Sequence, residues 1–322
     1  MQGLILHLQR LSTEDGPGIR STVFFKGCPL QCAWCHNPES LAYKPQVQWL
    51  ENRCIDCRTC LEACPQGSLA KNGSGQVVID RRRCDGCGEC TRACPSNALE
   101  LLGRRTSASE LLPELLKDSA YYITSSGGVT LSGGEPTFQA SFSAELLQGL
   151  RGAGVHTALD TCGLCSRRTL ERLWPWVDLF LFDLKLDDPA LHRRYTGQDN
   201  AVLLANLEWL AEQILIQPGE KELWVRTPLI PGATCTYENI NAIGARLAKL
   251  GSAIRRWELC AFNNLCRDKY RRLDMAWPYQ EAMLLQQADL EQAGEWARSS
   301  GVDPDLVFVT GASQVERLAS AE

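Results

Sequence analysis

From residue 103 onward, the chain alternates helix-like segments with short apolar runs rich in β-branched and aromatic residues. The helix-like segments are 108–122, 143–154, 167–175, 201–213 and 239–251, and the runs that follow them are 127–136, 155–163, 176–185, 222–232 and 254–262. With the earlier run 21–28, the pattern predicts six strands joined by right-handed helical crossovers, and hence a parallel, barrel-like sheet. A long helix over 278–301 and a last short strand over 306–309 are expected to complete the chain.

Polar and sulfur-bearing residues follow these predicted strands at their carboxyl ends. Cys28 follows the first strand, Gly133, Gly134 and Glu135 the second, Asp160 the third, and Asp183 and Lys185 the fourth. In α/β barrels the carboxyl ends of the strands carry the functional site. We therefore expect these residues to converge on one rim.

The charge and hydropathy of the chain narrow the classes of partner. The 322 residues carry a formal net charge of −5, which leaves no broad basic surface for a nucleic acid backbone. The apolar run at the N-terminus is too short for a signal peptide, and nowhere do 18 uncharged apolar residues follow one another. The sequence predicts a cytoplasmic protein with neither a nucleic acid nor a membrane as partner.

Sixteen cysteines are more than packing requires in a reducing compartment, so metal ligation is the expected use of most of them. Eleven fall in three tight groups before residue 95. The other five are scattered and predicted to be small buried thiols or residues without a ligand role: Cys162, Cys165, Cys235, Cys260 and Cys266.

Two of the groups are complete runs of the form C-x2-C-x2-C-x3-C-P, which bacterial ferredoxins use for 4Fe-4S clusters. In such runs the fourth cysteine ligates the other cluster, which predicts one cluster on Cys54, Cys57, Cys60 and Cys94 and a second on Cys84, Cys87, Cys90 and Cys64. The alternative is a pair of zinc knuckles, which favour two C-x2-C pairs with a long spacer. Residues 50–102 are therefore expected to form an inserted ferredoxin-like domain that relays electrons.

Three arginines, Arg81 to Arg83, stand beside the second run. They could dock an acidic electron donor, or they could simply form a solvated face.

The remaining group, Cys28, Cys32 and Cys35, is one ligand short. Three thiolates leave one iron of a 4Fe-4S cluster without a protein ligand, so that iron can bind a small molecule. The alternative is a fourth ligand from elsewhere, with His36 the nearest candidate. An adjacent residue, however, points to the wrong side of the turn.

The C-x3-C-x-aromatic-C pattern, with Trp34 as the aromatic residue, resembles the signature of the radical S-adenosylmethionine (SAM) superfamily. More closely, the stretch 15–40 and the motifs LSGGEP, LDTCG, FDLK and RTPLIPG, in that order, resemble the glycyl-radical-enzyme activating enzymes. The resemblance covers nearly the whole chain, and the insertion matches the longer members of that family. It implies a partial (β/α)6 barrel formed by 1–49 and 103–322 around the inserted domain.

The resemblance also implies a chemistry. SAM would chelate the open iron, and its reductive cleavage would give a 5'-deoxyadenosyl radical that removes a hydrogen atom from a glycine in the C-terminal loop of a partner glycyl radical enzyme. The expected cofactors are SAM, one catalytic and two auxiliary 4Fe-4S clusters, and a monovalent cation. A flavodoxin or a ferredoxin would supply the electrons, and the protein would be an anaerobic oxidoreductase of the class EC 1.97.1.-.

The resemblance also implies roles for individual residues. Gly133 and Gly134 would let the backbone approach SAM, and Glu135 would bind its ammonium group. The expected ligands for the cation and the SAM carboxylate are Asp160, Asp183, Lys185 and Arg226. The alternative for Asp160 and Asp183 is that they cap helices after their strands, and the alternative for Lys185 is that it is an ordinary surface lysine. Asn263 stands where relatives commonly have a SAM-contacting histidine, so its role is open.

The stretch 14–20, EDGPGIR, is expected near the cluster mouth. Its glycines suit either a tight turn or contact with the incoming glycine loop.

Two rival functions are compatible with the cysteine pattern. A radical SAM enzyme with a small-molecule substrate would change a metabolite without a partner protein. A plain electron-transfer protein would not cleave SAM at all, and the barrel motifs speak against it.

Overall fold

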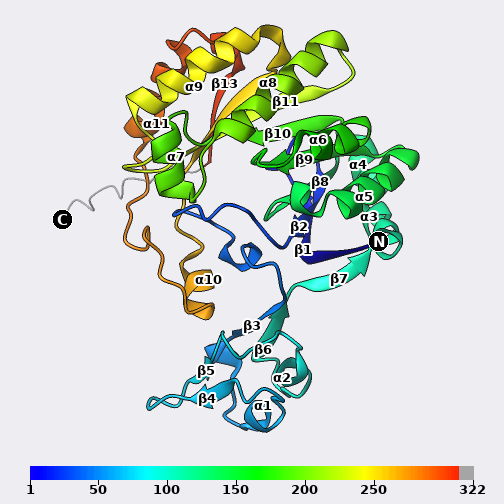
Figure 1. Ribbon diagram of the computed structural model, residues 1–322, viewed down its shortest axis with the longest axis vertical. Helices are drawn as coiled ribbons and strands as arrows, with labels where there is room; N and C mark the ends of the chain where they lie inside the picture. The colour runs from blue at the N-terminus through cyan, green and yellow to red at the C-terminus, as the bar shows by residue number, and fades with distance from the viewer. Residues whose placement is uncertain (312–322) are drawn as a thin grey trace, which may run out of the picture.

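The computed structural model describes residues 1–311, and its larger part is a nine-stranded sheet (Figure 1). In spatial order the strands are β13 (Val307–Thr310), β12 (Arg256–Ala261), β11 (Glu222–Leu229), β10 (Leu179–Asp183), β9 (His156–Thr161), β8 (Gly128–Gly133), β2 (Arg20–Phe25), β1 (Gln2–Ser12) and β7 (Arg104–Ser107). The run from β2 to β13 is parallel throughout, while β1 pairs antiparallel with both β2 and β7. The expected large parallel sheet of an α/β protein is confirmed.

Helices cover one face of this sheet, as Figure 1 shows. They are α3 (Ala108–Leu115), α4 (Ser119–Ser125), α5 (Ala140–Gly152), α6 (Arg167–Leu173), α8 (Ala201–Ile216), α9 (Tyr237–Leu250) and α11 (Gln287–Arg298). Another helix, α7 (Pro189–Thr196), contacts the loop after β2 instead. Strand residues such as Leu131, Phe180 and Val225 alternate toward this layer and are fully buried in the main core. The opposite face is more polar, because the alternate positions carry Asp160, Arg226 and other charged groups.

The sequence missed three features of this fold. Strands β1 and β7 were not expected, and they extend the sheet beyond β2. The predicted helix over 278–301 is wrong in its first part: α11 begins only at Gln287, where Gln286 and Asp289 form a capping box. The segment 108–122 is not one helix, because a 3-10 turn over Leu116–Asp118 separates α3 from α4.

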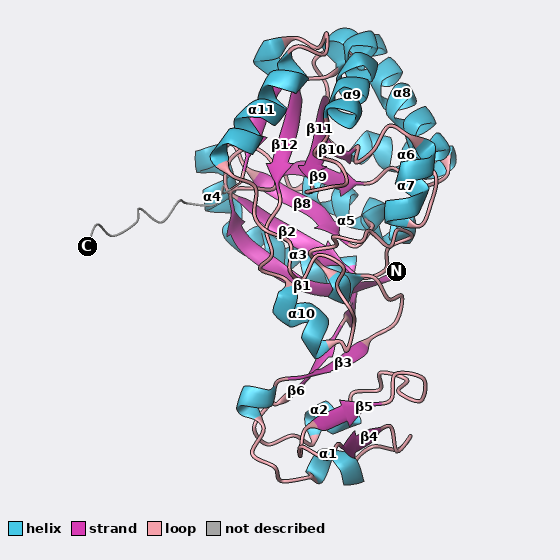
Figure 2. Cartoon of the chain, turned by 90° about the vertical axis from the view of Figure 1, so that its left-hand side faces the viewer, coloured by secondary structure: helices cyan, strands magenta, loops and turns pink. Residues whose placement is uncertain are grey.

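Residues 46–102 form a smaller unit at one end of the molecule (Figure 2). Its stem is the antiparallel pair β3 (Gln46–Trp49) and β6 (Leu99–Leu102), and a second pair joins β4 (Leu69–Lys71) to β5 (Val77–Ile79). Two short helices, α1 (Thr59–Glu62) and α2 (Glu89–Arg92), occupy corresponding places in the two cysteine runs. The apolar core of this unit is small, and Cys60 and Cys90 belong to it.

A short helix, α10 (Arg267–Arg272), lies between the large sheet and the small unit in both views (Figures 1 and 2). Within residues 1–311, no helix is both long and apolar enough to cross a membrane.

Candidate functional site

The predicted site residues of the large sheet lie at or beyond the carboxyl ends of its parallel strands. In register, Asp183 of β10 stands beside Arg226 of β11, and Arg226 stands beside Glu258 of β12. Cys28 follows β2, and Glu135 follows β8. The side chains therefore share the edge at which α/β proteins place their chemistry.

The loop 28–36 carries the incomplete cysteine group and has no regular secondary structure. Its middle is fixed by α7, because the N–H groups of Gln31 and Ala33 donate to the carbonyls of Thr196 and Tyr195 at 2.8 and 2.9 Å. Cys28 and Cys32 line one cavity with Tyr43 and other residues.

Burial raises the pKa of each thiol in this loop. For Cys28 the pKa rises to about 12, and nearby Glu135 adds to the effect; the pKa values of Cys32 and Cys35 are also raised. A metal centre binds the thiolate and displaces the proton, so these raised pKa values describe the protein without its cluster. Three such thiols on one loop fit an iron-sulfur cluster with three protein ligands.

The glycines after β8 have a structural reason of their own. Gly133 has φ +100°, and a Cβ at Gly134 would lie 2.4 Å from the carbonyl oxygen of Gly27. Only glycine lets this turn pack against the end of β2. Their contact with SAM remains a prediction.

Glu135 is 1% exposed and already accepts hydrogen bonds from neighbouring donors. One carboxylate oxygen, Oε1, accepts from the amide and the hydroxyl of Thr137 and from the hydroxyl of Thr161, while Oε2 accepts from the amide of Cys162 at 2.8 Å. The Oε2 atom therefore retains acceptor capacity for a further donor, such as an ammonium group.

Asp160 and Asp183 are partnered differently. The Oδ2 atom of Asp160 accepts from the hydroxyl of Ser132 at 2.6 Å and lies 4.0 Å from Arg226 Nη1, whereas its Oδ1 atom is buried without a partner within residues 1–311. Asp183 accepts from Lys185 Nζ at 2.5 Å. Burial works to lower the pKa of Lys185, but Asp183 together with Cys32 and Cys162 raises it overall. An unpaired buried carboxylate oxygen beside this pair fits a cation or a donor group from a ligand.

Burial and the neighbouring Asp183 raise the pKa of Asp160 to about 7, against the opposing effect of Arg226. Because the folded protein then holds a proton that the unfolded chain has released, this carboxyl group costs stability as the pH rises from about 4 to about 7. We expect Asp160→Asn to gain stability relative to the unsubstituted protein over that interval, by about 1.4 kcal/mol for each unit of pKa shift. Thermal unfolding of both proteins, free of metal and SAM, at several pH values tests this. Parallel pH profiles would contradict it.

Arg226 is paired inside the protein. Its Nε atom donates to Glu258 Oε2 at 2.8 Å, its Nη2 atom donates to the carbonyl of Glu14, and Glu258 Oε1 lies 2.7 Å from Arg256 Nε. Burial tends to lower the pKa of Arg226, but Asp160 and Glu258 outweigh this and raise it. The sequence analysis missed Glu258, although a charged residue within the apolar run 254–262 is the same signal that singled out Arg226.

Trp34 and Asn263 lie on one side of the cysteine loop. Trp34 is 4% exposed and packs against Tyr195 and Tyr279. The backbone carbonyl of Asn263 accepts a hydrogen bond from His36 Nε2 at 2.7 Å. These contacts assign both residues to the support of the loop, and their contact with SAM stays a prediction.

The stretch 14–20 joins the antiparallel strands β1 and β2 ahead of Arg20, whereas Cys28 follows β2. It reaches the charged face of the sheet, because the carbonyl of Glu14 accepts a hydrogen bond from Arg226. Its position near the cluster mouth stays a prediction. Gly16 and Gly18 have φ values of +119° and +68°, which agrees with the tight-turn alternative.

The small unit brings its eight cysteines together in two groups. One cavity is lined by Cys54, Cys57, Cys60 and Cys94, and another by Cys64, Cys84, Cys87 and Cys90. The fourth cysteine of each run thus lies with the first three of the other run, as the ferredoxin rule predicts. Across residues 1–311, no three His, Cys, Asp or Glu side chains gather as ligands of a single metal ion would.

Arg81 does not face solvent as a docking residue would. It donates to the carbonyl of Val47 in β3 and, at 3.1 Å, to the carbonyl of Arg272 in α10. It therefore ties the small unit to α10.

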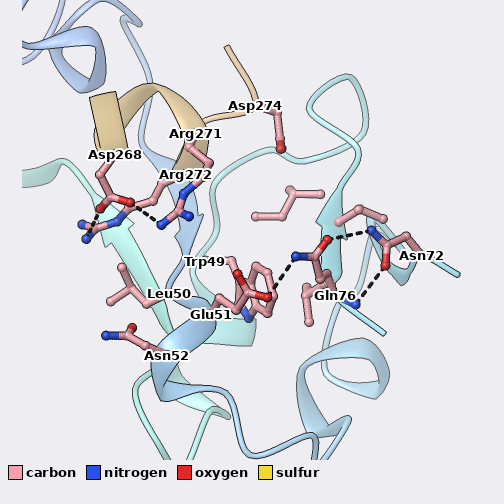
Figure 3. Close-up of a pocket in the computed structure, with 13 residues that line it drawn as sticks. Trp49, Leu50, Glu51, Asn52, Asn72, Gln76, Asp268, Arg271, Arg272 and Asp274 are labelled. Carbon is pink, nitrogen blue, oxygen red and sulfur yellow. Dashed lines mark hydrogen bonds and ion pairs between the residues drawn. The ribbon is translucent and has the colours of Figure 1, made fainter. Parts of the chain in front are cut away.

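Beside this tie lies a cavity of ≈ 460 Å³ that none of the cysteines lines (Figure 3). Several polar groups around it pair within their own side: Asp268 binds Arg271 and Arg272 of α10, and Gln76 binds Glu51 and Asn72 of the small unit. Asp274, which also lines the cavity, lies 3.7 Å from Arg81 of the small unit. The cavity therefore lies between the two parts, beside the contacts of Arg81.

Comparisons with known proteins agree with the cysteine geometry. Two family patterns described as "4Fe-4S dicluster domain" match residues 53–98 and 76–130, and one described as "4Fe-4S single cluster domain" matches residues 14–64.

Among curated proteins, the trans-4-hydroxy-L-proline dehydratase activating enzyme of Clostridioides difficile is 39% identical over 91% of this chain and 95% of its own length. The benzylsuccinate synthase activating enzyme of Thauera aromatica is 41% identical over 86% of this chain and 83% of its own length. Among solved structures, Streptococcus suis SuiB bound to its precursor peptide SuiA has a TM-score of 0.52 and 14% identity, and it covers 88% of this chain and 46% of that one. That last likeness concerns the fold alone.

Proposed function

Because the chain belongs to the glycyl-radical-enzyme activating enzymes, we propose that Cys28, Cys32 and Cys35 hold its catalytic 4Fe-4S cluster and leave one iron open for SAM. The protein is a radical SAM oxidoreductase that activates a partner glycyl radical enzyme. When bound, the reduced cluster and SAM supply the 5'-deoxyadenosyl radical that removes a hydrogen atom from the partner's glycine. The observation that carries the cluster assignment is the placement of three half-buried thiols on one loop at the carboxyl edge of the sheet.

Residues at the sheet edge would hold SAM through complementary charge. The free capacity of Glu135 Oε2 suits the ammonium group, and the unpaired Asp160 Oδ1 with Asp183 suits a monovalent cation near the SAM carboxylate. Arg226 and Lys185 are already paired with Glu258 and Asp183. Arg226 and Lys185 would neutralise the negative charges of Glu258 and Asp183 at this edge while SAM binds.

The two cavities of the small unit would hold two auxiliary clusters, which brings the total to three. The grouping of Cys94 with the first run and of Cys64 with the second supports this count. On this proposal residues 50–102 are a ferredoxin-like domain inserted between 1–49 and 103–322, which together form a partial (β/α)6 barrel.

The partner's contribution would be the glycine in its C-terminal loop, and the electrons would come from a flavodoxin or a ferredoxin in the cytoplasm.

The direct test uses the full chain, purified and reconstituted without oxygen. Incubated with SAM, a strong reductant and a candidate glycyl radical enzyme, the protein is expected to release 5'-deoxyadenosine and, with its true partner, to produce a protein-centred radical in electron paramagnetic resonance (EPR). A partner whose radical-bearing glycine is replaced by alanine is the control, and it should show no signal.

Two other outcomes would contradict the proposal. Cleavage of SAM with conversion of a metabolite, and without a protein radical, would favour the small-molecule enzyme. No cleavage of SAM under strong reductant would favour the electron-transfer protein.

A further inference from the structure

Helix α10 and the residue before it contact the carboxyl half of the cysteine loop through side chains. The hydroxyl of Tyr270 donates to the carbonyl of Cys35 at 2.9 Å, and the thiol of Cys266 lies 3.8 Å from the same oxygen. The ammonium group of Lys269 donates to the carbonyl of His36 at 3.1 Å and to the side chain of Asn37 at 2.9 Å. These contacts join residues more than 230 positions apart in the chain.

Two other contacts hold this half of the loop: the N–H of Cys35 donates to the carbonyl of Cys32 at 3.0 Å, and His36 Nε2 contacts the carbonyl of Asn263 at 2.7 Å. Within residues 1–311, no backbone N–H donates to the carbonyl of Cys35 or of His36. By contrast, the middle of the loop is bound to the backbone at the end of α7. Among the described residues, the carbonyl of Cys35 therefore takes its hydrogen bonds from the side chains of Tyr270 and Cys266.

The donors themselves are held firmly. Tyr270 is 5% exposed and stacks on Trp277, with ring centroids 5.3 Å apart. Lys269 also binds Glu39 Oε1 at 2.7 Å, so its ammonium group has three partners on the loop and on the turn that follows it. Behind them, Arg81 of the small unit binds the carbonyl of Arg272, at the end of α10.

We propose that Tyr270, with Lys269, is a positioning residue for the catalytic cluster: it fixes the carbonyl of Cys35 and, through it, the direction of the Cys35 thiolate. This inference rests on the proposed function, because it takes Cys35 as a cluster ligand. A cluster with only three protein ligands has no spare one, so a loosened Cys35 would expose it to loss.

Tyr279 provides a matched control. It lies beside the same apolar cluster as Tyr270, against Trp34, and no hydrogen bond of its hydroxyl is recorded among the described residues. Tyr279→Phe therefore removes the same atom from the edge of the same apolar cluster, keeps the ring against Trp34 and takes no hydrogen bond from the loop.

The experiment follows the loss of the catalytic cluster from the reconstituted full-length protein in the presence of an iron chelator. The readout is the part of the reduced EPR spectrum that changes when SAM is added, which separates the catalytic cluster from the auxiliary ones. We expect Tyr270→Phe to lose this SAM-responsive signal about 10-fold faster than the unsubstituted protein, because a buried carbonyl loses its donor. Tyr279→Phe is expected to stay within about twofold.

The outcomes separate this inference from the proposed function. If the unsubstituted protein has no SAM-responsive signal, the proposed function fails. If it has one and Tyr270→Phe loses it at the unsubstituted rate, the positioning role is overturned. If Tyr270→Phe does not fold, Lys269→Gln tests the same role, because the side chain of Lys269 is 37% exposed and its replacement leaves the apolar core intact. It should also lose the signal faster, and an unchanged rate would overturn the role.

Discussion

Replacing Cys32 with alanine is expected to abolish radical formation on the partner and to lower the iron content from about 12 to about 8 atoms per chain. Cys32 lies at the centre of the only cysteine group with three members, so its loss leaves two thiols, too few to retain the cluster. The auxiliary clusters depend on other cysteines, in separate cavities, and should remain. Iron analysis and EPR on protein reconstituted without oxygen measure both effects.

Cys235→Ala is the control for this experiment. Cys235 is a half-buried thiol outside the three groups, and its pKa is raised to about 11 by burial and by Asp289. The variant should keep its iron and its activity. An unchanged iron content in Cys32→Ala would refute the assignment of the catalytic cluster to this loop.

Replacing Glu258 with alanine is expected to destabilise the fold by about 3 kcal/mol. Glu258 joins Arg226 and Arg256, and the side chains of Glu258 and Arg226 are 7% and 12% exposed. Removal of the carboxylate leaves Arg226 as a buried charge without a hydrogen-bonded carboxylate; Asp160 lies 4.0 Å away, and Asp183 stands beside Arg226 on the neighbouring strand. Thermal and urea unfolding of the two proteins in the same reconstituted state measure the difference.

An exposed ion pair offers the comparison. Arg193 and Asp199 are 69% and 42% exposed, and Asp199→Asn should leave the unfolding curve unchanged, because water screens such pairs. If Glu258→Ala also left the unfolding curve unchanged, the pair of Glu258 and Arg226 would not stabilise the fold. Arg226 would then be available to bind a ligand.

The parts of the fold that could be predicted are those with a local signal. The six parallel strands from β2 to β12 follow from apolar runs bounded by turns, and the cysteine groups follow from spacing alone. Strand β1 was not predicted, because half of it faces water and its partner β7 lies about a hundred residues along the chain. The local sequence pattern gives no sign of a pairing between such distant segments.

The same limit applies to the site. Asp160, Asp183 and Arg226 could be placed on one edge because each belongs to a predicted strand. The pairing of Arg226 with Glu258 and the contact of Tyr270 with Cys35 depend on how distant segments meet. Arg81 was considered as a docking residue, but its position beside Val47 and Arg272 depends on the packing of two parts of the molecule.

The stem of the small unit has an evolutionary consequence. Gln46 and Leu102 are directly opposite each other in the β3–β6 pair, so the chain enters and leaves the unit through neighbouring backbone positions about 5 Å apart. A deletion between these two points would leave a gap that a short turn can close without disturbing the nine-stranded sheet. A gene lineage could therefore acquire or discard the whole eight-cysteine module in one event.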